Sequence, residues 1–436
     1  MTVRSWLATC SSSTCTTVAD TSTIPYPEKR PPSPKFFVSD TSSCSEIPGS
    51  CSSTSRDTSC SSLQSNLSLQ TLPSVPSLQN LSPETLNLSI SHLCVTSLKP
   101  RPVHVACLAV SGHLLYAASN NEINVYDLTT NYTHLDAFNG KDSSSGTVKS
   151  IVFCDGKVFT SHQNGKIRVW QVTATKRHKL LTTLPTVNDR LRRFILPKNY
   201  VNVRRHKKRL WIEHADAVSG LAVANGLICS VSWDKCFKIW RPSDLRCVQS
   251  VKAHEDAINA VAVSADGTLY TGSADRRIRV WAKPFGEKRH SLVATLEKHK
   301  SAVNALALNG DGSVLFSGAC DRSILVWERE DSANHMVVTG ALRGHTKAIL
   351  CLINVSDLLL SGSADRTVRV WQRGQAGRYC CLAVLEGHRK PVKSLVAVPV
   401  SAGLISVFSG SFDGEIKVWQ VSVSSLNSPS STDTLK

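Results

Sequence analysis

The chain has 436 residues, of which 41% are hydrophobic and 19% charged, and its formal net charge is +17 at pH 7. This length allows one large domain with flanking tails. We expect neither a membrane span nor a secretory signal, because no apolar run of about 18 residues exists and the N-terminus lacks an apolar core of about 7–15 residues. The fifteen cysteines form no CxxC pair and no zinc-like Cys/His cluster. This indicates free thiols in the cytoplasm or nucleus, with no metal site.

The composition of residues 1–90 predicts a tail outside the folded domain. They contain 35 Ser or Thr, two Phe, one Trp and one Tyr, and their net charge is −1. Such a segment buries too little apolar surface to offset its chain entropy, so we expect disorder over 1–90 and over the last residues, 424–436. Ser33, Ser82 and Ser428 each precede Pro. The tails could therefore be phosphorylated or could serve solubility alone, and the sequence leaves both interpretations open.

From Val103 to Val421 one short pattern occurs seven times. The clearest copies read SVSWDKCFKIW, TGSADRRIRVW, SGSADRTVRVW and SGSFDGEIKVW, with an Asp six residues before a Trp. Successive copies place their aromatic residues 44, 70, 41, 46, 44 and 48 residues apart, and five copies carry a His 20 to 25 residues before the Asp. Short apolar runs at such regular spacing predict the strands of an all-β fold.

This pattern resembles WD40 repeats, each of which builds one blade of a β-propeller. We therefore predict an all-β fold, a seven-bladed WD40 propeller over residues 91–423, in which packing around a ring buries the sheet faces. The resemblance implies that each blade holds a buried hydrogen-bonded network of a His, a Ser two residues before the Asp, the Asp and the Trp. The complete sets are His214, Ser232, Asp234 and Trp240; His254, Ser273, Asp275 and Trp281; His345, Ser363, Asp365 and Trp371; and His388, Ser411, Asp413 and Trp419.

These Ser, His and Asp residues are the types found in a catalytic triad. A triad occurs once in an enzyme, whereas this trio recurs in blade after blade, so we interpret it as structural and expect no catalytic residues and no cofactor. The copy around Asp321 has Ala319 at the Ser position. The first two copies lack the His and carry Asn120 and Asn164 in place of the Asp, so we expect less rigid blades there.

Closure of the ring needs one strand from outside the repeats, because the chain leaves its last copy after VWQVSV. The segment Ser91–Pro100 has a matching apolar alternation and directly precedes the first copy. We predict that 91–100 forms the outer strand of the last blade, which leaves no long exposed edge.

The single spacing of 70 residues marks a basic insertion at 173–210, with twelve Lys or Arg, one Asp and a net charge of +11. We place it between the third and fourth strands of the second blade, with RLWIEH as the outer strand, on the face opposite the His and Asp turns. A short hairpin is expected around Pro197–Asn199. Three interpretations stay open: a solvated loop, a nuclear import signal, or a surface for an acidic protein, nucleic acid or phosphoinositide. Specific nucleic-acid binding is not expected, because few aromatic residues are interleaved. The candidate basic patch is Arg190, Arg192, Arg193, Arg204, Arg205, Lys207, Lys208 and Arg209.

A second candidate surface comes from the turns that hold the Asp residues. Four adjacent copies place a base directly after this Asp, and two copies place a large aromatic residue directly before it. We expect these side chains around the mouth of the central channel, as a face that binds an acidic peptide or a regulatory protein. They are Trp233, Lys235, Arg276, Arg322, Arg366 and Phe412.

The insertion TLPTVNDRLRRFILPKNYV, the following VRRHKKRLWIEHADAVSGLA and the Ser-rich leader resemble the JINGUBANG-like WD-repeat proteins of plants. The resemblance covers roughly residues 90–421. It implies a non-enzymatic scaffold for protein–protein interactions in a plant regulatory pathway, in cytoplasm and nucleus. We expect the propeller itself to be monomeric. The alternative is a substrate receptor of a cullin-type ubiquitin ligase. Such receptors carry Trp-Asp-x-Arg, whereas the blade Trp residues here precede Gln171, Arg241, Ala282, Glu328, Gln372 and Gln420.

Overall fold

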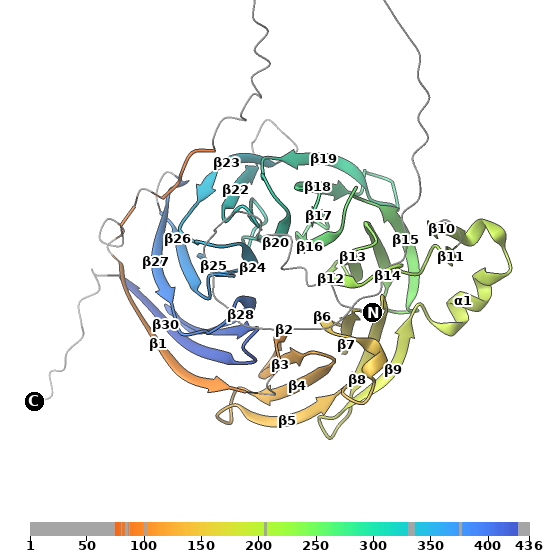
Figure 1. Ribbon diagram of the computed structural model, residues 1–436, viewed down its shortest axis with the longest axis horizontal. Helices are drawn as coiled ribbons and strands as arrows, with labels where there is room; N and C mark the ends of the chain where they lie inside the picture. The colour runs from red at the N-terminus through yellow and green to blue at the C-terminus, as the bar shows by residue number, and fades with distance from the viewer. Residues whose placement is uncertain are drawn as a thin grey trace, which may run out of the picture. The chain divides into compact units, whose positions relative to one another are not determined.

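The computed structural model describes residues 75–79, 81–82, 86, 88–99, 103–204, 207–329, 336–374 and 377–425. Within these residues, seven four-stranded antiparallel sheets are arranged as the blades of a ring (Figure 1). The predicted fold class, an all-β, seven-bladed propeller, is confirmed. The strands nearest the axis are β2, β6, β12, β16, β20, β24 and β28, as Figure 1 shows.

Blades 1 to 3 precede or flank the insertion. From the axis outward they contain β2 (Val105–Ser111), β3 (Leu114–Ser119), β4 (Glu122–Asp127) and β5 (Thr133–Phe138); β6 (Val148–Cys154), β7 (Lys157–His162), β8 (Ile167–Val172) and β9 (His178–Leu184); and β12 (Val218–Ala224), β13 (Leu227–Ser232), β14 (Cys236–Arg241) and β15 (Arg246–Lys252). A short 3-10 helix, η3 (Ser143–Ser145), lies between blades 1 and 2.

Blades 4 to 7 complete the ring. They contain β16 (Ile258–Val263), β17 (Leu269–Ser273), β18 (Arg277–Ala282) and β19 (Ser291–Glu297); β20 (Val303–Leu308), β21 (Val314–Ala319), β22 (Ile324–Arg329) and β23 (Met336–Leu342); β24 (Ile349–Val355), β25 (Leu358–Ser363), β26 (Val368–Arg373) and β27 (Tyr379–Leu385); and β28 (Val392–Ser401), β29 (Leu404–Ser411), β30 (Ile416–Ser425) and β1 (Leu88–Leu98).

The hydrophobic core is divided among the seams between neighbouring blades. In the seam of blades 5 and 6, for example, Phe316 and Val326 pack with Leu359 and Trp371. The sheets approach closely here, since a Cβ on Gly318 would lie 2.4 Å from a methyl carbon of Ile349. Each blade therefore depends on both neighbours for its burial, which makes closure of the ring important for stability.

Strand β1 closes the ring by pairing antiparallel with β30, from Leu88 opposite Ser425 to Leu98 opposite Ile416. The closing strand thus begins three residues before the predicted Ser91, and β30 extends past the predicted end of the propeller at 423. The predicted tail over 1–90 is wrong at its C-terminal end, because Leu88 and Ile90 pack against the core of blade 7. Ser33 and Ser428 lie outside the described residues.

A second correction concerns the residues before β1. The described residues between 75 and 86, here called the strap, follow the outer strands β23 and β27 (Figure 1). The amide of Leu78 donates to the carbonyl of Ala341 at 3.1 Å, and its carbonyl accepts from the amide of Tyr379 at 2.9 Å. The apolar strap residues pack from outside into successive seams: Val75 between blades 4 and 5, Leu78 between blades 5 and 6, and Leu81 and Leu86 between blades 6 and 7.

The insertion begins later than predicted. Strand β9 (His178–Leu184) pairs with β8 and is the outer strand of blade 2, so RLWIEH is not part of that blade. The inserted residues instead connect β9 to β12 of blade 3. Antiparallel strands place this connection on the same face as the turn of Asp234, so the predicted placement on the opposite face is wrong. We call the face with these turns and connections the upper face.

The insertion contains a helix and a hairpin, and it projects from the ring in Figure 1. Helix α1 (Val187–Phe194) is capped by the hydroxyl of Thr186, which accepts from the amide of Asp189. The segment Pro197–Asn199 forms a 3-10 turn, η4, because Pro197 suits a first helical position and cannot donate to a strand. The hairpin follows this turn in the chain and is formed by β10 (Tyr200–Arg204) and β11 (Lys207–Leu210).

Candidate interaction surface

Buried hydrogen-bonded networks hold the upper face together in blades 3 to 7. In blade 6, His345 Nδ1 donates to Asp365 Oδ2 at 2.7 Å. The Ser361 hydroxyl donates to His345 Nε2 and accepts from Trp371 Nε1, both at 2.8 Å. The His and Asp therefore join the connection that enters the blade to the turn between its second and third strands.

The hydroxyl in this network stands four residues before the Asp, not two as predicted. The residues that hold this position are Ser230, Thr271, Ser317, Ser361 and Ser409. The predicted serines lie at the turn, too far along the strand to meet the two rings. Ser363, for example, donates to the Lys347 carbonyl and accepts from the Asp365 amide, both at 3.1 Å. Ser232, Ser273 and Ser411 make the same pair of turn contacts.

Two further corrections follow from this register. The fifth blade is complete despite Ala319, because Ser317 binds His299 at 2.7 Å and Trp327 at 2.8 Å. Blade 2 keeps part of the network, since Trp170 Nε1 donates to the Thr160 hydroxyl at 2.9 Å, and Thr160 also bonds to His162 at 2.8 Å.

Burial and hydrogen bonding shift the pKa values of the groups in these networks. Burial alone would raise the pKa of the Asp275 carboxyl, but the hydrogen bond and charge of His254 hold it at about 2. Burial lowers the pKa of His214 and His388, which favours neutral rings. Because the side chains of these His rings are buried and engaged at both nitrogens, the networks act as structural elements of the face.

The predicted bases lie on the rim of the upper face. Lys235, Arg276, Arg322 and Arg366 all adopt positive φ angles, from 70° to 77°, where blades 2 and 7 have Gly165 and Gly414. A non-glycine residue in this conformation costs about 1–2 kcal/mol. Lys235 Nζ donates to the carbonyl of Glu255, on the connection into the next blade. The three arginine residues are exposed.

Nearer the axis, the predicted aromatic residues have partners that sequence reasoning missed. Lys149 Nζ lies 5.1 Å from the ring centroid of Trp233, and the rings of His104 and Phe412 are 5.8 Å apart. Lys149 and Lys393 are the second residues of the innermost strands β6 and β28. The signal was present in the repeat alignment, because both strands begin Val-Lys-Ser where the other innermost strands have no base.

Both of these lysines are partly buried, and no ion pair joins either of them to a described residue. Burial, and then the positive charge of Lys393, lower the pKa of Lys149 to about 8. Burial also lowers the pKa of Lys393. Burial raises the pKa of the nearby Cys107 thiol to about 12, so this thiol is neutral and cannot neutralise them. The upper face therefore holds two lysine side chains, one of which lowers the pKa of the other, and neither forms an ion pair with a described carboxylate.

In the predicted basic patch, some residues contact the rest of the domain and others are exposed. Arg190 binds Glu213 at 3.1 Å, and Arg193 binds Asp189 at 3.0 Å and lies 4.6 Å from the centroid of the Trp211 ring. Arg209 donates to the His214 carbonyl at 2.8 Å. These three residues attach the insertion to blade 3, whereas Arg192 and Lys208 are exposed. Arg205 and the side chains of Arg204 and Lys207 lie outside the described residues.

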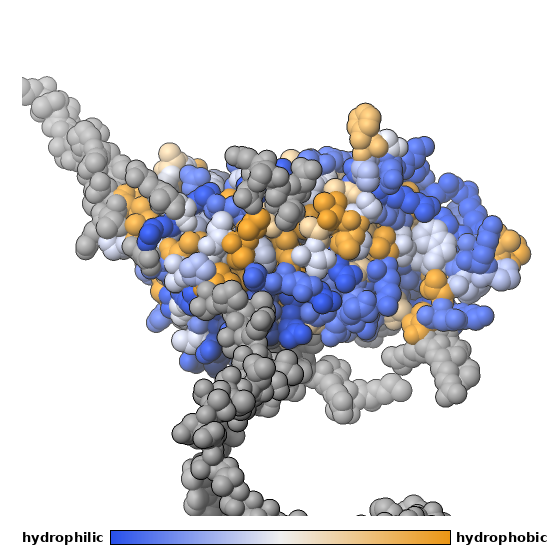
Figure 2. All heavy atoms as spheres, turned by 90° about the horizontal axis from the view of Figure 1, so that it is seen from above, coloured by the Kyte–Doolittle hydropathy of each residue, from blue (hydrophilic) through white to orange (hydrophobic). Residues whose placement is uncertain are grey.

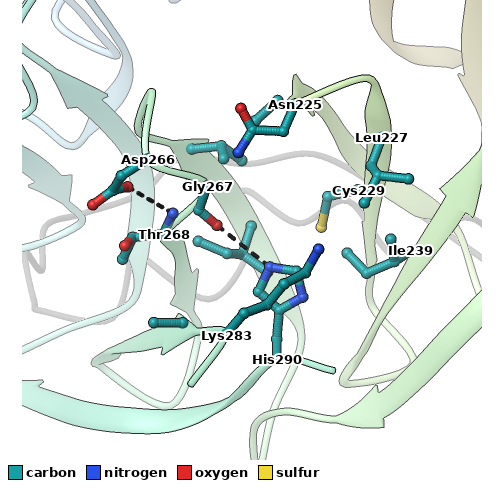
Figure 3. A pocket seen from close by; sticks show the side chains of 13 residues that line it. Asn225, Leu227, Cys229, Ile239, Asp266, Gly267, Thr268, Lys283 and His290 are labelled. Carbon is teal, nitrogen blue, oxygen red and sulfur yellow. Dashed lines mark hydrogen bonds between the residues drawn. The ribbon is translucent and has the colours of Figure 1, made fainter. Parts of the chain in front are cut away.

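A small cavity of about 280 Å³ opens between blades 3 and 4 on the lower face (Figure 3). Its walls include Leu227, Cys229 and His290, whose Nε2 lies 3.3 Å from the Gly267 carbonyl. Burial lowers the pKa of His290 and raises the pKa of the Cys229 thiol. Because a buried, neutral thiol is a poor nucleophile, the chemistry of this cavity favours packing rather than catalysis.

No group of three or more His, Cys, Asp and Glu side chains in the described ranges is arranged to hold a metal ion. The helices that the structure describes are too short or too polar to cross a membrane.

Comparison with known proteins agrees with this fold. The family model "WD domain, G-beta repeat" matches residues 245–282, 290–328, 336–372 and 379–420, which cover most of blades 4 to 7. The chain is 23% identical over 237 residues to the nuclear distribution protein nudF of Aspergillus niger, a match that covers 54% of this chain and 51% of that protein. It is 25% identical over 251 residues to the ribosome biogenesis protein YTM1 of Eremothecium gossypii, covering 56% and 51%.

A shorter match, 38% identical over 66 residues, joins the chain to BEACH domain-containing protein B of Arabidopsis thaliana and covers 15% of this chain and 2% of that protein. The chain thus spans about half, or much less, of the curated relatives it matches. The matches support a WD-repeat protein, a class that generally serves as a scaffold for protein interactions. The finer resemblance to the JINGUBANG-like group is not confirmed by them.

Proposed function

We propose that this WD-repeat propeller is a non-enzymatic scaffold that binds an acidic segment of a partner protein over the axis of its upper face. The observation that carries the proposal is the pair of partly buried lysines, Lys149 and Lys393, whose charges no described carboxylate neutralises. A carboxylate or phosphate of the partner would enter between them and relieve their mutual repulsion. Because these ammonium groups are partly desolvated, such a pairing is stronger than one formed in bulk water.

The side chains around the lysines suit the rest of such a segment. Trp233 and Phe412 offer two large aromatic surfaces near the axis, and aromatic residues often supply most of the binding energy of an interface. The exposed Arg276, Arg322 and Arg366 lie farther out on the rim, where positive charge accelerates the approach of an acidic partner.

The proposal is tested with a fluorescein-labelled synthetic peptide rich in Asp and Glu, followed by fluorescence anisotropy. The Lys149→Gln/Lys393→Gln double variant should weaken binding by about ten-fold or more, because both central charges are lost. Lys390→Gln is the matched control, since it removes an exposed charge near the same face and should change the affinity by less than about three-fold. Equal affinity of the double variant and the wild-type protein would remove the basis of the proposal.

The same peptide provides a second readout. Since the pKa of Lys149 is about 8, this side chain loses its charge between neutral and alkaline pH. The groups that face it are Lys393, Cys107, His104 and Trp233. Binding should weaken from about pH 7 to about pH 9 in the wild-type protein, and this pH dependence should shrink when Lys149 is Gln.

We further propose that the protein acts in a plant regulatory pathway, in cytoplasm and nucleus, as the JINGUBANG-like proteins do. The support is the sequence of the insertion, on which that resemblance rests, together with the basic run RRHKKR over 204–209. Fluorescence imaging of the tagged chain in plant cells tests the location, and exclusion from the nucleus would contradict it.

A further inference from the structure

The helix of the insertion presents an apolar face to solvent. Along α1, Val187, Leu191 and the following Ile195 are spaced by four residues, and 70%, 55% and 73% of their surfaces are exposed. Of the seventeen exposed large hydrophobic residues in the described part of the chain, nine lie between Leu180 and Val201. At the right-hand end of Figure 2, where the insertion projects, apolar residues lie on the outer surface among hydrophilic ones. A patch of this concentration on a soluble domain marks an interaction site.

The orientation of this helix is fixed by polar contacts on its other face. Arg190 pairs with Glu213, and Arg193 contacts both Asp189 and the Trp211 ring. After the helix, Asn199 Nδ2 donates to the Arg193 carbonyl at 2.8 Å, and the Tyr200 hydroxyl donates to the Phe194 carbonyl at 2.9 Å. The usual arrangement is therefore inverted, since the charged face packs on the domain and the apolar face has no partner among the described residues.

A groove lies beside this apolar face. It has a volume of about 510 Å³ and runs between α1, β9 and the turn between β14 and β15. Leu181, Val187 and Leu245 provide apolar walls, and Arg192 lines it without an ion pair or hydrogen bond to another described residue. The groove can thus take an apolar side chain beside an acidic one.

Charge selects among the possible occupants. A second copy would bring the +11 charge of 173–210 against itself, and residues 1–90 of this chain carry only −1. A flat anionic bilayer would leave the concave groove unfilled. We propose that α1 and this groove dock an amphipathic acidic segment of a partner protein, with its apolar residues on Val187, Leu191 and Ile195 and its carboxylates toward Arg192. This surface is separate from the lysine pair near the axis, so the two proposals can fail independently.

Selection from a displayed library of random peptides of about 16 residues tests this inference while the partner is unidentified. The full chain is the bait, and the Leu191→Gln/Ile195→Gln variant is the counter-selection. Because both side chains are exposed, this variant should have the same melting temperature as the wild-type protein. Peptides that bind only the wild-type protein should carry a net negative charge and several large apolar residues. Their affinity by anisotropy should fall about ten-fold or more in the variant and should not change in Val400→Gln, an equally exposed apolar residue of blade 7.

Vesicles of phosphatidylcholine with phosphatidylserine test the alternative that the apolar face binds an anionic membrane. The inference predicts no sedimentation of the protein with them beyond that of Leu191→Gln/Ile195→Gln. Three outcomes would overturn it: no selected peptide that distinguishes the variant, selected peptides without acidic residues, or vesicle binding that the variant abolishes.

Discussion

The strap and the insertion both contain leucines in segments that the repeats do not predict, yet the fates of these leucines are opposite. Leu78 of the strap is partly buried in the seam between blades 5 and 6, whereas Leu191 of the insertion is exposed. The difference comes from what each segment meets on the ring. A Cβ on Gly340 would lie 2.3 Å from Leu78, so the missing side chain creates the space that this leucine fills. The insertion meets Glu213 and Trp211 instead, and these attract its arginines and turn its leucine outward.

This contrast separates two roles of added segments in a propeller. A segment whose apolar residues are buried contributes to stability, and a segment whose apolar residues stay exposed is available for binding. Removal of the first should therefore lower the melting temperature, while changes in the second should alter only binding or location.

The largest effect is expected from loss of the closing strand. A chain that starts at Val103 lacks β1 and exposes the edge of β30, so it should lose several kcal/mol of stability or aggregate. A chain that starts at Leu88 keeps β1 but lacks the strap, and its melting temperature should lie between those of the chain that starts at Val103 and the full-length chain. If the two truncated chains melt at the same temperature, β1 does not close the ring in the way described.

A smaller loss of stability is expected when one buried network is disrupted, and it should be similar on the strap side and on the insertion side of the ring. Asp365→Ala in blade 6, whose outer strand contacts the strap, and Asp234→Ala in blade 3, beside the insertion, each leave a buried His and two backbone amides without their acceptor. Each should lower the unfolding free energy by about 1–3 kcal/mol or more in denaturant titration. A loss of one binding activity at unchanged stability would instead indicate a direct role for that Asp.

The networks also predict a direction for acid unfolding. The pKa of Asp275 is held at about 2, below its unfolded value, so its contribution is present above that unfolded value and is lost as the pH falls toward about 2. The lowered pKa values of His214 and His388 act in the same direction below their unfolded value of about 6.5.

The sequence predicted the Asp, His and Trp of each network because each has a fixed place in a repeat. It did not identify the right hydroxyl, since Ser361 and Ser363 lie on the same side of one strand and only the positions of the rings distinguish them. The strap was missed because it lies at the end of a Ser/Thr-rich region and its binding site is formed by Gly340 and Gly374, more than 250 residues later in the chain. The outer strand of blade 2 was missed because the basic residues around it made HKLLTTL read as part of the insertion.

One pair of matched substitutions distinguishes the buried leucine of the strap from the exposed leucine of the insertion. Leu78→Ala should reduce stability by about 1–2 kcal/mol, because a partly buried leucine loses its packing in a seam. Leu191→Ala should change stability by less than about 0.5 kcal/mol, because the side chain is exposed in the folded protein. Urea unfolding of both variants measures the difference. Equal losses would mean that the insertion also stabilises the ring.

The smallest effect on stability is expected from the basic hairpin. Replacing Arg204, Arg205, Lys207 and Lys208 by Gln removes four charges from a connection outside the blades, so the melting temperature should stay within about 1 °C of the wild-type value. Nuclear accumulation of the tagged chain should fall if this run is an import signal. The matched control is Arg190→Gln/Arg193→Gln, which removes bases that attach α1 to Glu213, Asp189 and Trp211. The control should loosen the insertion without reducing import. If the hairpin variant keeps its location, its partners and the salt dependence of its binding, its charge serves only as a solvated surface, and the functional part of the insertion is reduced to the apolar face of α1.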